Sequence, residues 1–76
     1  MDAPKEDLLA MAERHVREGE ARILRQERII AEMERDNHSE AERMGRVVLV
    51  QFKRSLDLAR EHLESLRRKA GQPESG

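Results

Sequence analysis

The chain contains no cysteine, no tryptophan and no tyrosine, and Phe52 is its single phenylalanine. The absence of cysteine excludes a disulfide framework and a zinc site built on thiolates. The four glycines stand alone, so no glycine-rich loop is present to cradle a phosphate. Without disulfides or a zinc site, a chain of 76 residues buries too small a core to be more than marginally stable by itself. Self-association is therefore the expected source of additional stability.

Charged residues are what the chain has in abundance, at 41% of the total. The 15 basic and 16 acidic residues are interspersed and give a net charge of −1, so no overall field draws the chain to nucleic acid or to an anionic membrane. The opening stretch MDAPKEDLL lacks the basic start and apolar core of a signal peptide, and no apolar run approaches membrane-spanning length. We therefore expect a cytoplasmic protein without membrane contact.

Apolar or small residues in the first half of the chain recur at spacings that alternate between three and four. They are Leu9, Ala12, Val16, Gly19, Ile23, Gln26, Ile30 and Met33. This heptad pattern predicts a helix over about 4–35, with Asp2 as its cap and Pro4 in its first turn. Four glutamates share one heptad position beside this seam: Glu13, Glu20, Glu27 and Glu34. Pairs such as Glu13–Arg17 have the spacing of ion pairs within a helix.

A turn is predicted over 36–39, where the heptad pattern stops. Asn37 tolerates the left-handed conformation that closes many helices. Ser39 and Glu42 then form the S-x-x-E pattern of a capping box, in which each side chain binds a backbone N–H of the other residue. The chain therefore ends one helix and starts another within about four residues, as in an αα-hairpin.

A second helix is predicted over about 40–70, and its apolar stripe consists of Ala41, Met44, Val48, Phe52, Leu56, Ala59, Leu63, Leu66 and Ala70. Gly71 and Pro73 would close it, and a disordered tail over 71–76 is expected. Two helices of matched length joined by a short turn predict a single all-α domain over 1–76, an antiparallel two-helix hairpin of the coiled-coil type. In such a hairpin, positions whose numbers sum to about 75 lie level.

The stretch RVVLVQF, residues 46–52, supplies more apolar residues than one seam needs. A β-strand would suit its propensity, but the helical stripe passes through it in phase and a lone strand would have no partner. Left exposed in a monomer, the surplus would favour aggregation. We therefore expect a homodimer in which two hairpins form a four-helix bundle, or a further protein partner. The predicted self-association interface consists of Leu24, Ile29, Val47, Leu49, Val50 and Leu58.

The sequence contains few residues that suggest a catalytic or metal-binding site. His15 and His62 would come within about a helical turn of each other in the hairpin and could form a metal or pH-sensitive cluster. However, neither Glu-x-x-His nor His-Glu-x-x-His occurs, so exposed structural histidines are the simpler interpretation. A chain this thin offers no pocket in which burial could shift a pKa. The expectation is a protein that is not an enzyme and has no cofactor and no metal.

Nucleic-acid binding through an arginine-bearing face is the alternative function. The candidate contacts are Arg22, Arg25, Arg67, Arg68 and Lys69. Glutamates interleave with nearly all of the arginines, and no stacking aromatic residues accompany them. Solvated faces with many ion pairs are the simpler interpretation, and the alternative requires arginines that cluster on one face of the hairpin dimer.

Several segments resemble a set of small hairpin proteins of alphaproteobacteria. In the first helix they are Ala12-Glu13-Arg14-His15-Val16, Glu18-Gly19-Glu20, Arg22-Ile23, Gln26 and Ile29-Ile30; then come the turn Glu34-Arg35-Asp36-Asn37-His38 and, in the second helix, Phe52, Leu56, Leu58 and His62. Asn37 departs from the pattern, where glycine is the usual residue. The resemblance covers residues 12–66 and implies a hairpin of bacterial origin. No activity is established for that set, so it implies no site.

Overall fold

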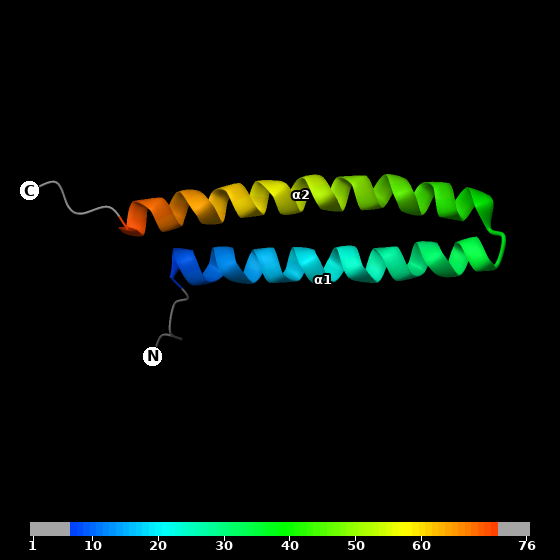
Figure 1. Cartoon of the computed structure of the whole chain (residues 1–76), viewed down its shortest axis with the longest axis horizontal. Coiled ribbons are helices and arrows are strands. Elements are labelled where there is room, and N and C mark those ends of the chain that lie inside the picture. The colour runs from blue at the N-terminus through cyan, green and yellow to red at the C-terminus, as the bar shows by residue number, and fades with distance from the viewer. Residues whose placement is uncertain (1–6, 72–76) are drawn as a thin grey trace, which may run out of the picture.

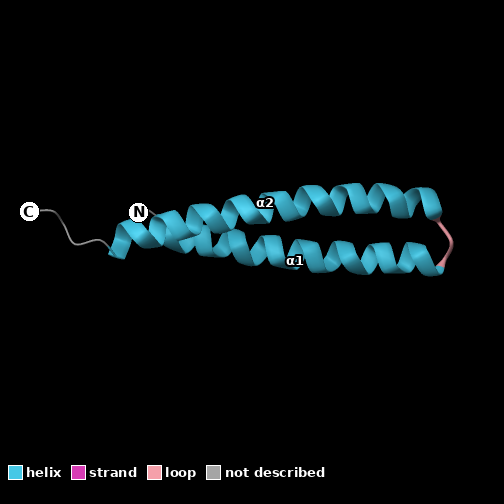
Figure 2. Ribbon diagram, turned by 45° about the horizontal axis from the view of Figure 1, so that its top comes forward, coloured by secondary structure: helices cyan, strands magenta, loops and turns pink. Residues whose placement is uncertain are grey.

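The computed structural model describes residues 7–71, which form two α-helices joined by a tight turn (Figure 1). Helix α1 spans Leu8–Arg35 and helix α2 spans Ser39–Gly71. The helices run side by side in opposite directions, so the prediction of an antiparallel all-α hairpin is confirmed (Figure 2). The segment 46–52 is helical throughout, and the strand alternative is wrong.

Helix α1 begins where an aspartate supplies its cap. The Asp7 side chain accepts a hydrogen bond from the Ala10 N–H at 2.7 Å, and the Asp7 carbonyl accepts from the Met11 N–H at 3.0 Å. Asp7 thus satisfies one of the amide groups that a helix leaves without a partner at its start. The predicted cap, Asp2, and Pro4 lie outside the described residues, as do positions 72–76 of the expected tail.

The turn closes α1 in the way expected of an asparagine. Asn37 has a φ of 60°, which confirms the left-handed conformation predicted for it. Its N–H donates to the Glu34 carbonyl at 3.3 Å, and the His38 N–H donates to the Met33 carbonyl at 2.9 Å. These two bonds are those of a Schellman motif, which satisfies the last carbonyl groups of a helix.

The start of α2 differs from the predicted capping box. The Glu42 N–H donates to the carbonyl of His38 at 2.8 Å, so His38 takes the N-cap position and Ser39 is the first helical residue. The Glu42 carboxylate binds the guanidinium of Arg46 at 2.7 Å instead of turning back to the helix start. The strong charged partner one turn ahead of Glu42 displaces the weaker backbone contact.

The core of the hairpin consists of small residues facing large ones. A Cβ atom built on Gly19 would lie 3.1 Å from Cδ1 of Leu56, and one built on Gly45 would lie 3.1 Å from Cγ1 of Ile30. Both contacts follow the predicted register, in which level positions sum to about 75. All eight seam positions predicted for α1 are buried or half-buried. Each glycine therefore provides the space that the large residue opposite it fills.

The seam of α2 departs from prediction at its turn end. Met44, assigned to the stripe, is 62% exposed, whereas the next residue, Gly45, is buried. Gly45 lies under Ile30, and its carbonyl accepts a hydrogen bond from Nε2 of Gln26 at 2.9 Å. A glycine adds no hydrophobic signal to the sequence, so a stripe drawn from apolar residues passes over it. Ala70, at the other end of the predicted stripe, is also exposed.

Candidate interaction surfaces

The hairpin covers few of its own apolar side chains. Among residues 7–71, only four hydrophobic residues are buried: Ala12, Ile30, Leu56 and Leu63. Six large hydrophobic residues are between 48% and 67% exposed: Leu8, Leu24, Met44, Val47, Val50 and Leu58. Two helices that touch along one seam cannot cover the residues on their flanks, and this surplus makes the two broad faces of the hairpin the candidate functional surfaces.

One broad face carries a ladder of opposite charges. Its acidic side is the α1 set that shares one heptad position, and its basic side is a set in α2 that is also spaced by seven: Arg46, Lys53, Arg60 and Arg67. Three rungs are ion pairs: Arg46 with Glu34 at 3.1 Å, Arg60 with Glu20 at 3.2 Å and Arg67 with Glu13 at 3.4 Å. We call this surface the ladder face. Glu13 thus pairs with Arg67 across the hairpin, and not with Arg17 of its own helix, which was the predicted partner.

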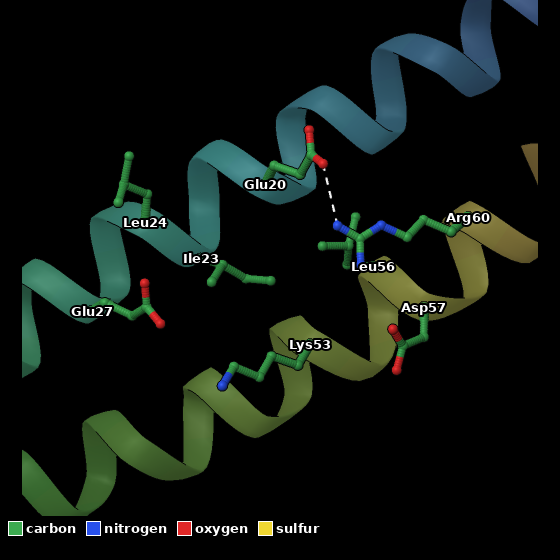
Figure 3. Close-up of a pocket in the computed structure, with 8 residues that line it drawn as sticks. All are labelled: Glu20, Ile23, Leu24, Glu27, Lys53, Leu56, Asp57 and Arg60. Carbon is green, nitrogen blue, oxygen red and sulfur yellow. Dashed lines mark hydrogen bonds and ion pairs between the residues drawn. The ribbon is translucent and has the colours of Figure 1, made fainter.

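The fourth rung of the ladder face borders a shallow groove of about 520 Å³ (Figure 3). Glu27 and Lys53 extend toward each other across it, while Glu20 and Arg60 form the adjacent rung. Leu24 stands on the side of α1 that faces away from α2 (Figure 3). Five of its eight lining residues are charged, and Ile23, Leu24 and Leu56 supply the rest of the lining.

The strongest contacts on the ladder face converge on Arg46. Its guanidinium binds the Glu42 carboxylate one turn back, at 2.7 and 3.1 Å, as well as Glu34 across the hairpin. The hydrogen bond to Glu42 raises the pKa of Arg46, and the charges of Glu42 and Glu34 act in the same direction, against an opposing effect of desolvation. Three charged groups thus meet on the surface beside the turn, and Arg46 links α2 to α1 through Glu34.

On the broad face opposite the ladder face, α2 carries no charged side chain over most of its length. Eight positions follow the alternating spacing of three and four: Ala41, Met44, Val48, Gln51, Ser55, Leu58, His62 and Ser65. None of them is Asp, Glu, Lys or Arg, in a chain of which 41% is charged. We call these positions the uncharged stripe. Met44 and Leu58 are its two exposed large hydrophobic residues, and Val48 is half-buried.

Helix α1 lines the other side of this face. A small groove of about 200 Å³ lies between the helices there, with His15, Arg22 and Ser55 among its lining residues. The Arg22 guanidinium lies over the ring of Phe52, 5.6 Å from its centroid. This cation–π contact covers one side of the aromatic ring and places the charge of Arg22 beside the uncharged stripe.

The structure distributes the six predicted interface residues over both faces and the seam. Leu24 lines the ladder-face groove, and Val50 lies on the same side because it is one turn from Lys53. Leu58 belongs to the uncharged stripe, and Val47 is its exposed neighbour on the back of α2. The other two, Ile29 and Leu49, are half-buried. Ile29 shares a heptad position with Arg22, so Ile29 lies beside the uncharged stripe. Leu49 lies in the seam, according to the register of the hairpin.

The histidine cluster finds no support among residues 7–71. His15 and His62 are both exposed, and only His15 lines the small groove. No three side chains of the types that ligate metals lie close enough within that range to hold an ion.

The arginines proposed for nucleic-acid contact do not share a face. Arg67 belongs to the ladder face, whereas Arg22 lies on the opposite side over Phe52. Arg68 lies 3.9 Å from Glu64 on α2. Within residues 7–71, Arg67 and Arg68 thus each lie within 4 Å of a glutamate, and Arg22 lies on a different side from Arg67.

Two features were missed by the reasoning from sequence, although the sequence contained a signal for each. The basic residues of the ladder face recur every seven positions, in register with the glutamates that were recognised. Ala41, Met44 and Val48 of the uncharged stripe were assigned to the α2 seam and Leu58 to the self-association interface, because an absence of charge gives no hydrophobic signal. Its eight positions show the same alternating spacing that identified α1.

No protein-family model matches the chain, and comparisons with curated proteins and with solved structures give no significant match. Neither α1 nor α2, as far as the structure describes them, is apolar over a stretch long enough to cross a membrane.

Proposed function

We propose that this chain is a small, non-catalytic protein-interaction module that works as a self-associated hairpin, with two copies forming a four-helix bundle. One observation carries the proposal: six large hydrophobic residues are about half to two-thirds exposed, while four hydrophobic residues form the whole buried core of residues 7–71. A core of that size gives marginal stability, and surfaces of that kind are normally covered by another protein surface.

Self-association is favoured over a dependence on some other single partner by the geometry of the hairpin. A two-helix hairpin has two broad faces, and pairing with a copy of itself covers one of them in both molecules at once. The product is a four-helix bundle, in which each helix gains a second neighbour and the flanking positions of the first seam become core.

The alternative, a hairpin dimer that binds RNA or DNA, would need a face on which arginines outnumber acids. The pairing of Arg46, Arg60 and Arg67 with glutamates gives it no such face on the ladder side. Nucleic-acid binding draws free energy from the counterions that are released when Lys or Arg side chains bind phosphates. A guanidinium that is already paired with a carboxylate contributes little to this release.

Sedimentation equilibrium at several protein concentrations tests the proposal. The expected mass approaches twice the 8.8 kDa of one chain as concentration rises, with helical circular dichroism throughout. A mass that stays at 8.8 kDa over the whole range, with helicity retained, would reject self-association. Tight, salt-sensitive binding of an RNA probe by the same sample would favour the alternative function.

A further inference from the structure

We infer that the second copy docks on the uncharged stripe of α2, with the two α2 helices antiparallel and Val48 of each copy packed against Leu58 of the other. The inference rests on the proposed self-association and assigns to it a face, an orientation and a register. It follows from the contrast between the two broad faces of the hairpin and from the spacing of the stripe.

The cost of desolvation separates the two faces. Docking on the ladder face would bury the pairs Arg46–Glu34, Arg60–Glu20 and Arg67–Glu13, each of which is now partly hydrated. Removing a charge pair from water carries a desolvation penalty that the mutual attraction of the pair often does not recover. On the other face, the eight stripe positions of α2 carry no charge, and the charged groups beside them in the small groove, Arg22 and Glu18, belong to α1.

The spacing of the stripe makes it a second coiled-coil seam. Its eight positions alternate by three and four over residues 41–65, which is the pattern that places side chains of one helix into the gaps of another. Helix α2 therefore carries two parallel seams, one filled by α1 and one open. The exposure of Met44 at 62% and of Leu58 at 66% shows which of the two seams lacks a partner within the hairpin.

The composition of the stripe selects a single antiparallel register. With Val48 opposite Leu58, all eight positions find a stripe residue of the second copy opposite them, because the segment 41–65 is then centred on the two-fold axis. A shift by one heptad places Val48 opposite Gln51 or Ser65 and leaves part of the stripe uncovered. In the full register, Gln51 lies opposite Ser55 near the axis, where the amide and the hydroxyl can form a hydrogen bond.

The middle of α1 lies at the same two-fold axis. When the α2 helices pair in this way, the α1 helices also face each other in antiparallel orientation, with residues near the middle of α1 level with one another. Arg22 lies on this face beside the stripe, and Glu18 lines the same small groove one turn before it. Because residue 22 is level with the axis at position 53, Arg22 of one copy lies level with Arg22 of the other, and Glu18 of each copy lies one turn, about 6 Å, along the helix from this pair.

The area that such a dimer would bury is sufficient for a stable complex. The stripe spans about 37 Å of helix at about 1.5 Å per residue. A face two helices wide, about 20 Å, gives about 700 Å² per copy and about 1,400 Å² in total. Specific interfaces bury about 1,200–2,000 Å² in total, so the face is large enough without any contribution from the termini.

A matched pair of substitutions tests the face. Leu58→Glu places a charge in the stripe, and Leu24→Glu makes the same change at a comparably exposed leucine on the ladder face. Both side chains are exposed, so both variants should keep the helical circular dichroism of the parent. We expect Leu58→Glu to raise the dimer Kd by about 100-fold or more, since each dimer would bury two unpaired carboxylates. Leu24→Glu should change it by less than about threefold.

Cysteine cross-linking tests the orientation and register, and the natural chain contributes no thiol. In the double variant Val48→Cys/Leu58→Cys, the two positions of one helix are about 15 Å apart, beyond the reach of an internal disulfide. Oxidation should therefore yield disulfide-linked dimers. Each single variant should remain unlinked, because like positions of the two copies are also about 15 Å apart in the antiparallel register.

The outcomes separate this inference from the proposed function. A parent that stays monomeric at every concentration rejects both. A dimer that Leu24→Glu disrupts and Leu58→Glu leaves intact keeps the proposed function and overturns the inference. Rapid cross-linking of the single Val48→Cys variant would show parallel α2 helices and would likewise overturn it.

Discussion

Gly19 of α1 lies against Leu56 of α2, so close that a Cβ atom at position 19 would sit 3.1 Å from the Leu56 methyl group. Nearer the turn, Gly45 of α2 lies against Ile30 of α1 at the same distance. The roles of the two helices are thus exchanged between the two contacts. Each helix gives a glycine to one contact and a large residue to the other, and each glycine lets the helix backbones approach closely at that contact.

The two glycines should respond differently to alanine, although the alanine Cβ meets its neighbour at the same distance. At position 19 the neighbouring atom is the end of a flexible leucine, which can move aside. At position 45 it is Cγ1 of Ile30, which is β-branched and nearly fixed in a helix, and Nε2 of Gln26 lies 3.4 Å away. Alanine gains about 1 kcal/mol of helix propensity at either site. We expect Gly19→Ala to be neutral within about 0.5 kcal/mol and Gly45→Ala to destabilise by about 1 kcal/mol.

Urea unfolding of both variants at one protein concentration measures the difference, since the concentration of a self-associating chain affects its apparent stability. A variant pair in which Gly19→Ala is the more damaging would contradict the assignment of Ile30 as the rigid neighbour.

The sequence predicted the hairpin well because three independent signals agreed. The heptad spacing of α1, the asparagine of the turn and the matched helix lengths each pointed to the same fold, and helix spacing depends only on local geometry. The register followed from the turn, because a tight connection leaves one way to place the helices side by side. The contact between Ile30 and Gly45, whose numbers sum to 75, follows from that register.

What the sequence reasoning missed were features whose meaning depends on the second helix. Gly45 is part of the seam only because Ile30 lies over it, and nothing local distinguishes it from a surface glycine. Glu13 has a suitable partner within its own helix in Arg17 and a better placed one across the hairpin in Arg67. Such choices are decided by distances that exist only after folding, so the pairings had to come from the structure.

Gln26 is the one polar residue predicted for the α1 seam, and its amide group has a defined task. Its Nε2 donates to the Gly45 carbonyl at 2.9 Å in a partly buried position. Gln26→Ala removes both this bond and the packing of the side chain, and should destabilise by about 1–2 kcal/mol. Gln26→Leu restores apolar contact without the bond and should lie within about 0.5 kcal/mol of the parent. Thermal and urea unfolding measure the stability of both variants. If the Leu variant were as unstable as the Ala variant, the hydrogen bond and not the packing would be the main contribution of Gln26.

Asn37 should tolerate glycine but not alanine. Its φ of 60° costs a residue with a Cβ about 1 kcal/mol or more, asparagine less and glycine almost nothing. We expect Asn37→Ala to destabilise by about 1 kcal/mol and Asn37→Gly to be neutral or stabilising by a few tenths. Asn37 is exposed, so loss of packing does not complicate the comparison. Equal stabilities of the Ala and Gly variants would show that the turn can close without a left-handed residue.

The ladder face should contribute specificity of helix pairing more than stability. The Arg60 and Glu20 side chains are 54% and 52% exposed, so water and salt screen their attraction strongly. A double-mutant cycle with Arg60→Ala and Glu20→Ala should therefore give a coupling of less than about 1 kcal/mol, and less still at high salt. The charge reversal Arg60→Glu places like charges opposite each other and should destabilise by more than Arg60→Ala does, at low salt only. Adding Glu20→Arg to the reversal should recover the loss, because the exchanged pair has the same geometry with its signs reversed. A double reversal that stays as unstable as the single one would mean that Arg60 acts through its aliphatic stem and not through its charge.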